Sequence, residues 1–439
     1  MSSEWREVQL SELMTVKHGF AFKGEHFSDA ETAYQLVTPG NFSIGGGFQL
    51  GKGKYYDGPV PSEYVLRRGD VVVTMTDLSK AADTLGFAAV IPETQGTTWL
   101  HNQRVGLVEV RPDAQVTLGY IHYLMRSSEY RHWVVSSATG STVKHTAPTR
   151  ISSYRFELPP LTDQVVIAEI LGALDDRITL LRETNATLEA IAQALFKSWF
   201  VDFDPVRARM EGRAPEGMNE ATAALFPDGF EESELGLVPR GWRVGTLGDI
   251  AQTVKQQLQP SQLHADINYV GLEHIPRKSL SLVSWGTADG LESAKATFGD
   301  GDILFGKLRP YFHKVVVAPF DGVCSTDILV CQARKSAYYG FVAMQLFSTT
   351  LIEFAERLSN GAKMPRVGWK DLAAYPVVIP TESVAVEYTL VIEPLLARMK
   401  ATVHEAQTLA TLRDTLLPRL ISGQLRLPEA ELQIQEAAT

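Results

Sequence analysis

The sequence predicts an α+β protein made by internal duplication, in which two similar domains are joined by two long antiparallel coiled-coil helices related by a pseudo-two-fold axis. Three observations lead to this prediction. Residues 161–200 carry a heptad pattern of apolar side chains, residues 382–421 carry a second such seam, and the same order of short motifs precedes each of them.

The first long helix is predicted from two interleaved sets of side chains at three- and four-residue spacing. The first set is Ile167, Leu174, Leu181, Leu188 and Leu195, and the second is Leu171, Ile178, Asn185, Ala192 and Trp199. A buried core helix usually has a wider apolar face, so we favour a coiled coil that needs a partner helix. About 38 helical residues would span roughly 60 Å. Asn185 in this seam is a candidate for fixing the register.

The first domain is predicted to mix strands and a helix. Runs rich in β-branched residues occur at 64–66, 69–74, 87–91 and 104–110, and each is bounded by turn residues. Residues 117–136 have the apolar spacing of a helix, and a last strand lies near 153–161. Pro159 and Pro160 end that strand, and the long helix follows.

The chain then repeats this order. The run WRVGTLGDI from Trp242 matches WREVQLSEL from Trp5, GDILF at 301–305 matches GDVVV at 69–73, and a helical pattern at 341–358 corresponds to the one at 117–136. The boundaries we expect are a first domain at 1–160, a central helix at 161–205, a linker or irregular wrap at 206–241, a second domain at 242–380, a distal helix at 381–425 and a tail at 426–439.

The net charge of −10 is unevenly distributed. Residues 1–160 hold 15 basic and 16 acidic side chains, and 242–380 hold 14 and 12, whereas 161–205 hold 3 and 8. The two domains are therefore nearly neutral, which neither indicates nor excludes DNA as a partner. The sequence lacks an apolar run of membrane-spanning length and an N-terminal signal pattern, so we expect no membrane association and a cytoplasmic location.

The motif search predicts no catalytic and no metal site. Two cysteines, Cys324 and Cys331, are too few for a disulfide framework or a paired-ligand zinc site and are expected to be buried. The run GGFQLGKG at 46–53 has the glycine and lysine spacing of a phosphate-binding loop but lacks the following Ser or Thr, so we interpret it as a chance match. Neither a Gly-x-Ser-x-Gly nor a His-Glu-x-x-His motif occurs.

Basic and aromatic side chains on loops are the best binding candidates, since such groups contact phosphates and base edges of DNA. The alternative, that each is simply a solvated surface residue, is about equally favoured. The loops around Lys144 and Lys363 hold equivalent places in the repeat, which strengthens that pair. The candidates are Lys52, Lys54, Tyr55, Tyr56, Lys144, His145, Lys307, Arg309, Tyr311, Lys363 and Arg366.

Several runs together resemble a known family. They are LTDQVVIAEILGALDDRI at 161–178, ALFKSWFVDFDPV at 194–206, FPD at 226–228, SELG at 233–236, PRGW at 239–242 and DTLLPRLISG at 414–423. These runs resemble the specificity (S) subunit of Type I restriction-modification systems, and the resemblance extends in order over nearly the whole chain. One departure is TESV at 381–384, where the first half has LTDQ, so the start of the second helix is atypical.

The resemblance implies a division of labour among subunits. Each domain would be a target recognition domain that reads one half of a bipartite, asymmetric sequence in double-stranded DNA. The helices would set the gap and dock two modification subunits, which bring S-adenosylmethionine and methylate adenine. Restriction subunits would add translocation and cleavage with ATP and Mg²⁺. The chain itself would be non-catalytic and without cofactor. The alternatives are an enzyme in its own right and a tandem-domain regulator without such partners.

Overall fold

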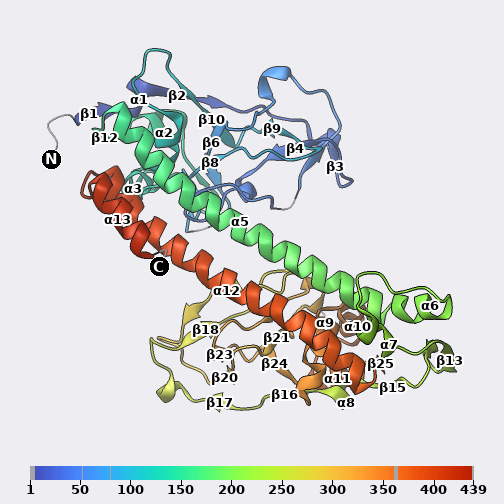
Figure 1. The fold of residues 1–439 in the computed structure, drawn as a ribbon. Coiled ribbons are helices and arrows are strands. Elements are labelled where there is room, and N and C mark those ends of the chain that lie inside the picture. Colours follow the sequence, from blue (N-terminus) through green and yellow to red (C-terminus); the bar gives the residue numbers. More distant parts are fainter. Residues whose placement is uncertain (1–4, 52, 80, 360–363, 438–439) are drawn as a thin grey trace. The chain divides into compact units, whose positions relative to one another are not determined.

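The computed structural model describes residues 5–51, 53–79, 81–359 and 364–437. Contacts divide the chain into two units. Unit 1 comprises Met1–Asp176 with Leu409–Thr439, and unit 2 comprises Arg177–Thr408. Both long helices, α5 (Leu161–Phe200) and α12 (Glu382–Ile421), contribute to both units (Figure 1). The two predicted long helices are thereby confirmed, and α12 begins at Glu382 despite its atypical first turn.

Unit 1 contains two four-stranded sheets and a short antiparallel strand pair. The first sheet has the spatial order β2 (Met14–His18), β10 (Val105–Val110), β6 (Val71–Thr74) and β8 (Ala88–Val90) and is antiparallel throughout. The second has the order β3 (Phe27–Ser28), β5 (Tyr55–Tyr56), β4 (Tyr34–Val37) and β9 (Thr98–His101). In the pair, β1 (Arg6–Gln9) lies against β12 (Arg155–Leu158), and β1 is followed by α1 (Leu10–Leu13).

Two details of the predicted first domain are wrong. The expected helix at 117–136 is two helices, α2 (Leu118–Leu124) and α3 (Ser128–Ser136), because the Ser127 side chain accepts a hydrogen bond from the Tyr130 amide and starts a new helix. The expected strand at 64–66 is the end of a 3₁₀ turn, η3 (Ser62–Tyr64), followed by a single bridge from Val65 to Leu100. The short helix α4 (Pro148–Ser152) precedes β12.

Unit 2 repeats the framework of unit 1. Its main sheet has the order β16 (Ala251–Thr253), β24 (Ile328–Ala333), β21 (Ile303–Gly306) and β22 (Val315–Val317). A five-stranded sheet has the order β17 (Gln257–Leu258), β20 (Lys295–Phe298), β23 (Gly322–Cys324), β18 (Asn268–Val270) and β19 (Gly286–Thr287). The pair of β15 (Arg243–Thr246) with β25 (Pro376–Ile379) corresponds to β1 with β12, and α8 (Leu247–Ile250) corresponds to α1.

The helical part of unit 2 is also broken where its counterpart in unit 1 is broken. The pattern at 341–358 forms α9 (Tyr339–Phe347) and α10 (Thr349–Leu358), and Ser348 caps the second helix through the Leu351 amide. The serine at the same place in each repeat explains why both predicted single helices are split. The short helix α11 (Trp369–Ala373) precedes β25 as α4 precedes β12.

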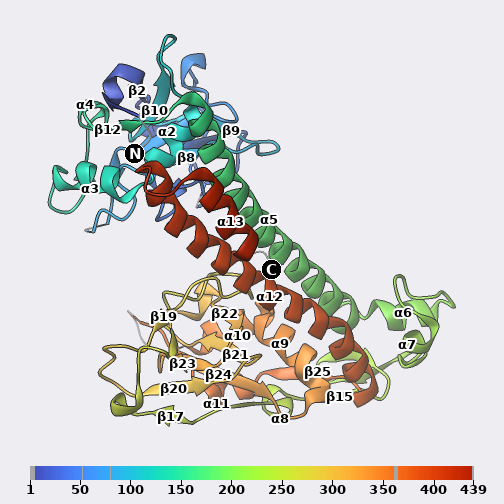
Figure 2. The same cartoon turned by 60° about the vertical axis from the view of Figure 1, so that its left-hand side comes forward.

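The long helices pair antiparallel in each unit through the predicted seam. In unit 1, Ile167, Leu171 and Leu174 of α5 belong to the same core as Leu416 and Leu420 of α12. In unit 2, Asn185 Nδ2 donates to the Met399 carbonyl at 3.2 Å, and Tyr388 Oη donates to that of Ala192 at 3.3 Å. The residue numbers of the contacts rise along α5 while they fall along α12, so the two helices run antiparallel (Figure 2). Leu181 is buried, whereas Leu188 and Leu195 are partly buried.

The segment predicted as a linker is folded. It contains α6 (Asp204–Met210), α7 (Glu220–Ala224) and a hairpin of β13 (Phe230–Ser233) with β14 (Gly236–Pro239). Phe226 is buried, and its ring lies 5.2 Å from that of Trp199. A few large apolar side chains pack this segment into unit 2. Its otherwise polar, Pro/Gly-rich composition gave no periodic pattern from which this packing could be predicted.

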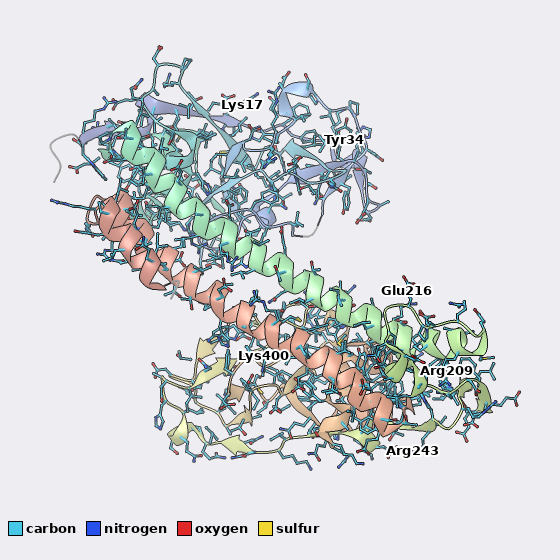
Figure 3. All side chains as sticks on the ribbon, viewed as in Figure 1. Lys17, Tyr34, Arg209, Glu216, Arg243 and Lys400 are labelled. Carbon is cyan, nitrogen blue, oxygen red and sulfur yellow. The ribbon has the colours of Figure 1, made fainter. Side chains whose placement is uncertain are left out.

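Three further features complete the description. The C-terminal part forms α13 (Leu427–Ala437), whose Ala430 is buried in unit 1. Lys400 of α12 points to the β-strands of unit 2, where its ammonium lies 2.7 Å from Asp300 Oδ1 (Figure 3). Cys324 and Cys331 are free and buried as expected, and burial raises the pKa of the Cys324 thiol to about 12. Among the described residues, no helix is long and apolar enough to span a membrane.

Candidate nucleic-acid interface

In unit 2, the turn from residue 307 to 314 joins β21 to β22 and brings three candidate residues together. The Lys307 amide donates to Asp327, the Arg309 amide donates to the Pro365 carbonyl at 2.7 Å, and Leu308 forms a bridge with Arg366. Arg366 is therefore a neighbour of Lys307 and Arg309, although more than fifty positions separate it from them in the sequence. Lys363 lies outside the described residues.

Two aromatic residues, Tyr311 and Phe312, belong to the same turn. Tyr311 is 43% exposed, and its ring centroid is 4.7 Å from that of Phe312. The Arg277 guanidinium stacks over Phe312 at 3.8 Å, and the Arg309 guanidinium lies 5.8 Å from the same ring. Arg366 forms an ion pair with Asp327, with Nε 3.2 Å from Oδ1. We call Arg277, Lys307, Arg309, Tyr311, Phe312 and Arg366 the basic-aromatic cluster.

Sequence reasoning missed Arg277 and Phe312. Arg277 comes from a segment of irregular structure between β18 and β19, where no periodic pattern singles it out. The adjacent basic pair of Arg277 and Lys278 was the one available signal. Phe312 stands next to Tyr311 in the sequence, but only the stacking of Arg277 on its ring shows that it belongs to the cluster.

The turn is held in an unusual backbone conformation. Lys278, Arg309 and His313 have φ of 52°, 51° and 50°, in the left-handed region that favours glycine. His313 is buried, and its Nε2 is 2.8 Å from the Phe347 carbonyl, which fixes the Nε2–H tautomer if the ring is neutral. Burial lowers the pKa of His313 and keeps the ring neutral near pH 7. The His313 carbonyl accepts from the Lys278 amide at 2.9 Å.

A buried carboxylate connects this region to α5 within unit 2. Glu189 accepts hydrogen bonds from the Leu280 amide at 2.7 Å and from Ser279 Oγ at 3.1 Å. Burial raises the pKa of Glu189, and these hydrogen bonds partly offset the increase. The segment that supplies Arg277 and Lys278 is thus fastened both to the turn and to the long helix.

In unit 1, Lys144 and His145 form the short strand β11 (Lys144–His145), which pairs with β7 (Thr76–Asp77). Because β7 follows β6, this ribbon occupies the place that Leu308 and Arg366 occupy in unit 2. Asp77 is buried and accepts hydrogen bonds from the Ser79 amide and from the amide and hydroxyl of Thr84. Burial raises the pKa of Asp77, but these bonds outweigh burial and lower it overall.

The candidates Lys54, Tyr55 and Tyr56 lie at or in β5, in the second sheet of unit 1, and not in the β7–β11 ribbon. Tyr56 is 2% exposed, and its ring lies 4.9 Å from that of Phe22, so its position in the core argues against a contact with DNA. The Lys54 ammonium lies 3.9 Å from the Phe27 ring, and burial followed by the charge of Arg104 lowers the pKa of Lys54. Lys52 lies outside the described residues.

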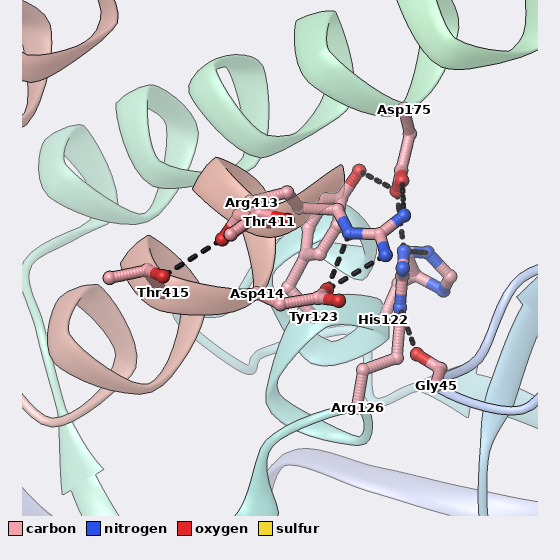
Figure 4. A network of polar contacts seen from close by, with 9 residues as sticks. All are labelled: Gly45, His122, Tyr123, Arg126, Asp175, Thr411, Arg413, Asp414 and Thr415. Atoms are coloured by element: carbon pink, nitrogen blue, oxygen red, sulfur yellow. Dashed lines mark hydrogen bonds and ion pairs between the residues drawn. The ribbon is translucent and has the colours of Figure 1, made fainter. Parts of the chain in front are cut away.

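A polar network fastens the first domain to both long helices inside unit 1 (Figure 4). Asp175 of α5 accepts from Arg126, from Tyr123 Oη at 2.9 Å and from Arg413 Nη1 of α12 at 2.6 Å. Arg126 Nε also donates to the Gly45 carbonyl at 3.0 Å. Burial raises the pKa of Asp175, but the charges and hydrogen bonds of the two arginines outweigh burial and lower it to about 2.

A family model described as the Type I restriction modification DNA specificity domain matches residues 2–190. The EcoDI specificity subunit of Escherichia coli is 28% identical over 277 residues, which cover 60% of this chain and 59% of that protein. The HindI specificity subunit of Haemophilus influenzae is 24% identical over 369 residues, which cover 72% of this chain and 79% of that protein. This chain is thus similar to Type I specificity subunits, through the family model over its first 190 residues and through these relatives over longer stretches.

The fold is also that of a solved structure. The crystal structure of the Type I restriction-modification S subunit from M. genitalium matches 96% of this chain and 97% of its own, with a TM-score of 0.54 at 14% sequence identity. The mixed helix-strand domains and the long helices are thus features of a known fold. The match to the EcoDI specificity subunit covers 59% of that protein, so this chain aligns with less than two thirds of its length.

Proposed function

We propose that this chain is the sequence-specific DNA-binding subunit of a Type I restriction-modification complex, in which each domain recognises one half of a bipartite, asymmetric target. The observation that carries the proposal is the duplicated framework. Both main sheets have the same strand order, and each carries a basic ribbon or turn after its Gly-Asp strand. The side chains on that framework differ, and two different half-sites require such a difference.

The helices are proposed to set the gap between half-sites and to dock two modification subunits. Residues 161–205 hold 3 basic and 8 acidic side chains, so their outer surface suits a protein partner better than a phosphate backbone. Restriction subunits complete the complex. In this assignment S-adenosylmethionine, ATP and Mg²⁺ belong to the partner subunits, and this chain contributes recognition without a catalytic step of its own.

Co-purification tests this assignment against a tandem-domain regulator that acts alone. The chain is co-expressed with the modification subunit of the same restriction system and isolated through a tag on either protein. We expect a stable complex that binds DNA more specifically than the isolated chain does. A chain that binds one site tightly as a monomer and retains no modification subunit would contradict the proposal.

A further inference from the structure

We propose that the turn at residues 307–314 is the element through which the second domain discriminates base pairs, with Arg309 and Tyr311 as the residues that determine specificity. The inference rests on the proposed function, namely DNA recognition by this domain. It adds which part of the domain reads the bases and which surrounding side chains hold that part in place.

Two of the arginines around the turn are held in place by neighbouring side chains. Arg277 is stacked on Phe312, and Arg366 is paired with Asp327, so both guanidinium groups are held in defined positions at the flanks. Groups held in this way suit contacts to phosphates, which fix the register of a protein on DNA. Tyr311 is the most exposed aromatic side chain of the cluster, and Arg309 precedes it by two residues. A guanidinium and a phenol can both form hydrogen bonds with base edges.

The backbone of the turn adopts a conformation that favours glycine. Among the described residues, five that are not glycine have a left-handed backbone; Arg309 and His313 lie in this turn, and Lys278 donates its amide to the His313 carbonyl. Glycine would adopt the same conformation without the steric cost of a Cβ atom. An arginine at such a position carries a backbone cost that glycine would avoid, which fits a role for its side chain. Buried His313 holds the strained turn through its bond to the Phe347 carbonyl.

The connection that forms this turn differs between the two repeats. The equivalent connection in unit 1, between β6 and β8, spans residues 75–87 and is longer. It is built on the buried carboxylate of Asp77, and among its described residues Leu78 is 64% accessible. The strand framework is shared while the turn changes in length and chemistry. This difference is expected if the turn determines which half-site each domain recognises.

The competing interpretation is that the turn contacts phosphates only. Loss of a phosphate contact weakens binding almost uniformly across sequences, whereas loss of a base contact relaxes the preference at one position. The two interpretations therefore predict different results from a selection for preferred sequences.

The test uses the assembled complex and a library of DNA duplexes with randomised half-sites, from which bound sequences are selected. The variants are Arg309→Gly and Tyr311→Ala. The control is Lys335→Ala, which also removes an exposed positive charge. Lys335 follows β24 at the end opposite to Ile328, the residue that pairs with Gly306 beside the turn. Thermal unfolding of each variant shows whether it folds.

We expect Arg309→Gly to remain folded and to lose about tenfold discrimination at one or more base pairs of one half-site. Tyr311→Ala should relax the same half-site, while the other half-site, the gap and the Lys335→Ala selection stay unchanged. An unchanged motif, or uniformly weaker binding with the motif retained, would overturn the inference. A wild-type complex that selects no bipartite motif would instead overturn the proposed function.

Discussion

Asp175 connects the first domain to both long helices within unit 1. Its carboxylate receives hydrogen bonds from Arg126 of the first domain and from Arg413 of α12, and it projects from α5 itself. Arg126 is almost fully buried, with 2% of its side chain exposed, so loss of its partner would leave a charge in the protein interior. The Gly45 loop is held by the same arginine. Unit 1 therefore depends on the balance between the Asp175 carboxylate and these two arginines.

The lowered pKa of Asp175 makes unit 1 sensitive to acid. Its value of about 2 lies below the value of about 4 for an unfolded chain, so the stabilisation is fully present above pH 4 and is lost as the pH falls toward 2. The difference corresponds to about 2 kcal/mol. We expect Asp175→Asn to lower the free energy of unfolding by about this amount at pH 7 and to flatten the pH dependence below 4, measured by urea unfolding.

The neighbouring Asp176 provides the control for that measurement. Asp176 is exposed on the same helix, so Asp176→Asn should leave both the stability and its pH dependence unchanged. His122 adds a separate loss of stability as the pH falls from about 6.5 towards 3, because burial and then the charge of Arg126 lower its pKa to about 3. An Asp175→Asn variant as stable as the wild type at pH 7 would show that the network contributes no net stability.

The candidate residues were the least predictable part of the molecule. Residue type placed Arg309 and Arg366 among the candidates, but only the pairing of Leu308 with Arg366 shows that they are neighbours. Tyr56 looked like a loop residue in a Gly-flanked run, yet its ring is in the core, because short strands alternate exposed and buried positions. Arg277 belongs to the cluster because its guanidinium stacks on the Phe312 ring, and no pattern in the sequence predicts that contact.

At the scale of the elements, the long helices were predictable and the shorter ones were not. A heptad pattern over forty residues determines both the seam and the need for a partner, which is why Glu382–Ile421 agrees with the predicted 382–421. The breaks at Ser127 and Ser348 depend on a single capping side chain inside an otherwise helical pattern. The folded segment between α5 and β15 depends on isolated aromatic residues, which periodicity does not reveal.

Asn185 gives a direct test of the helix pair. Its Nδ2 donates to the Met399 carbonyl, while Oδ1 is buried and has no hydrogen-bond partner among the described residues. Removing a half-satisfied amide from an apolar seam should stabilise it. We expect Asn185→Leu to raise the free energy of unfolding by about 1 kcal/mol. Thr187→Leu, at an exposed position of the same helix, should have little effect. A less stable Asn185→Leu variant would mean that the bond to Met399 outweighs the cost of burying the amide.

At the scale of the whole molecule, the duplication is what links sequence, fold and proposed function. The repeat was visible in the sequence because framework positions, such as the Trp-Arg starts and the Gly-Asp turns, are set by the strand order that both units share. The repeats differ in the 307–314 turn and its longer counterpart at 75–87, and in their second sheets. Neither the bases read nor the gap can be deduced from the framework, because both depend on side chains outside it.

The central claim is that the two domains each read one half-site and that the helices set the gap between them. The most direct measurement is sequencing of methylated adenines in DNA modified by this chain together with its modification subunits. The wild type should give one bipartite motif with a fixed gap, and insertion of about one heptad into both long helices should lengthen that gap while leaving both half-sites unchanged. A motif that is not bipartite, or a gap that the insertion does not alter, would contradict the claim.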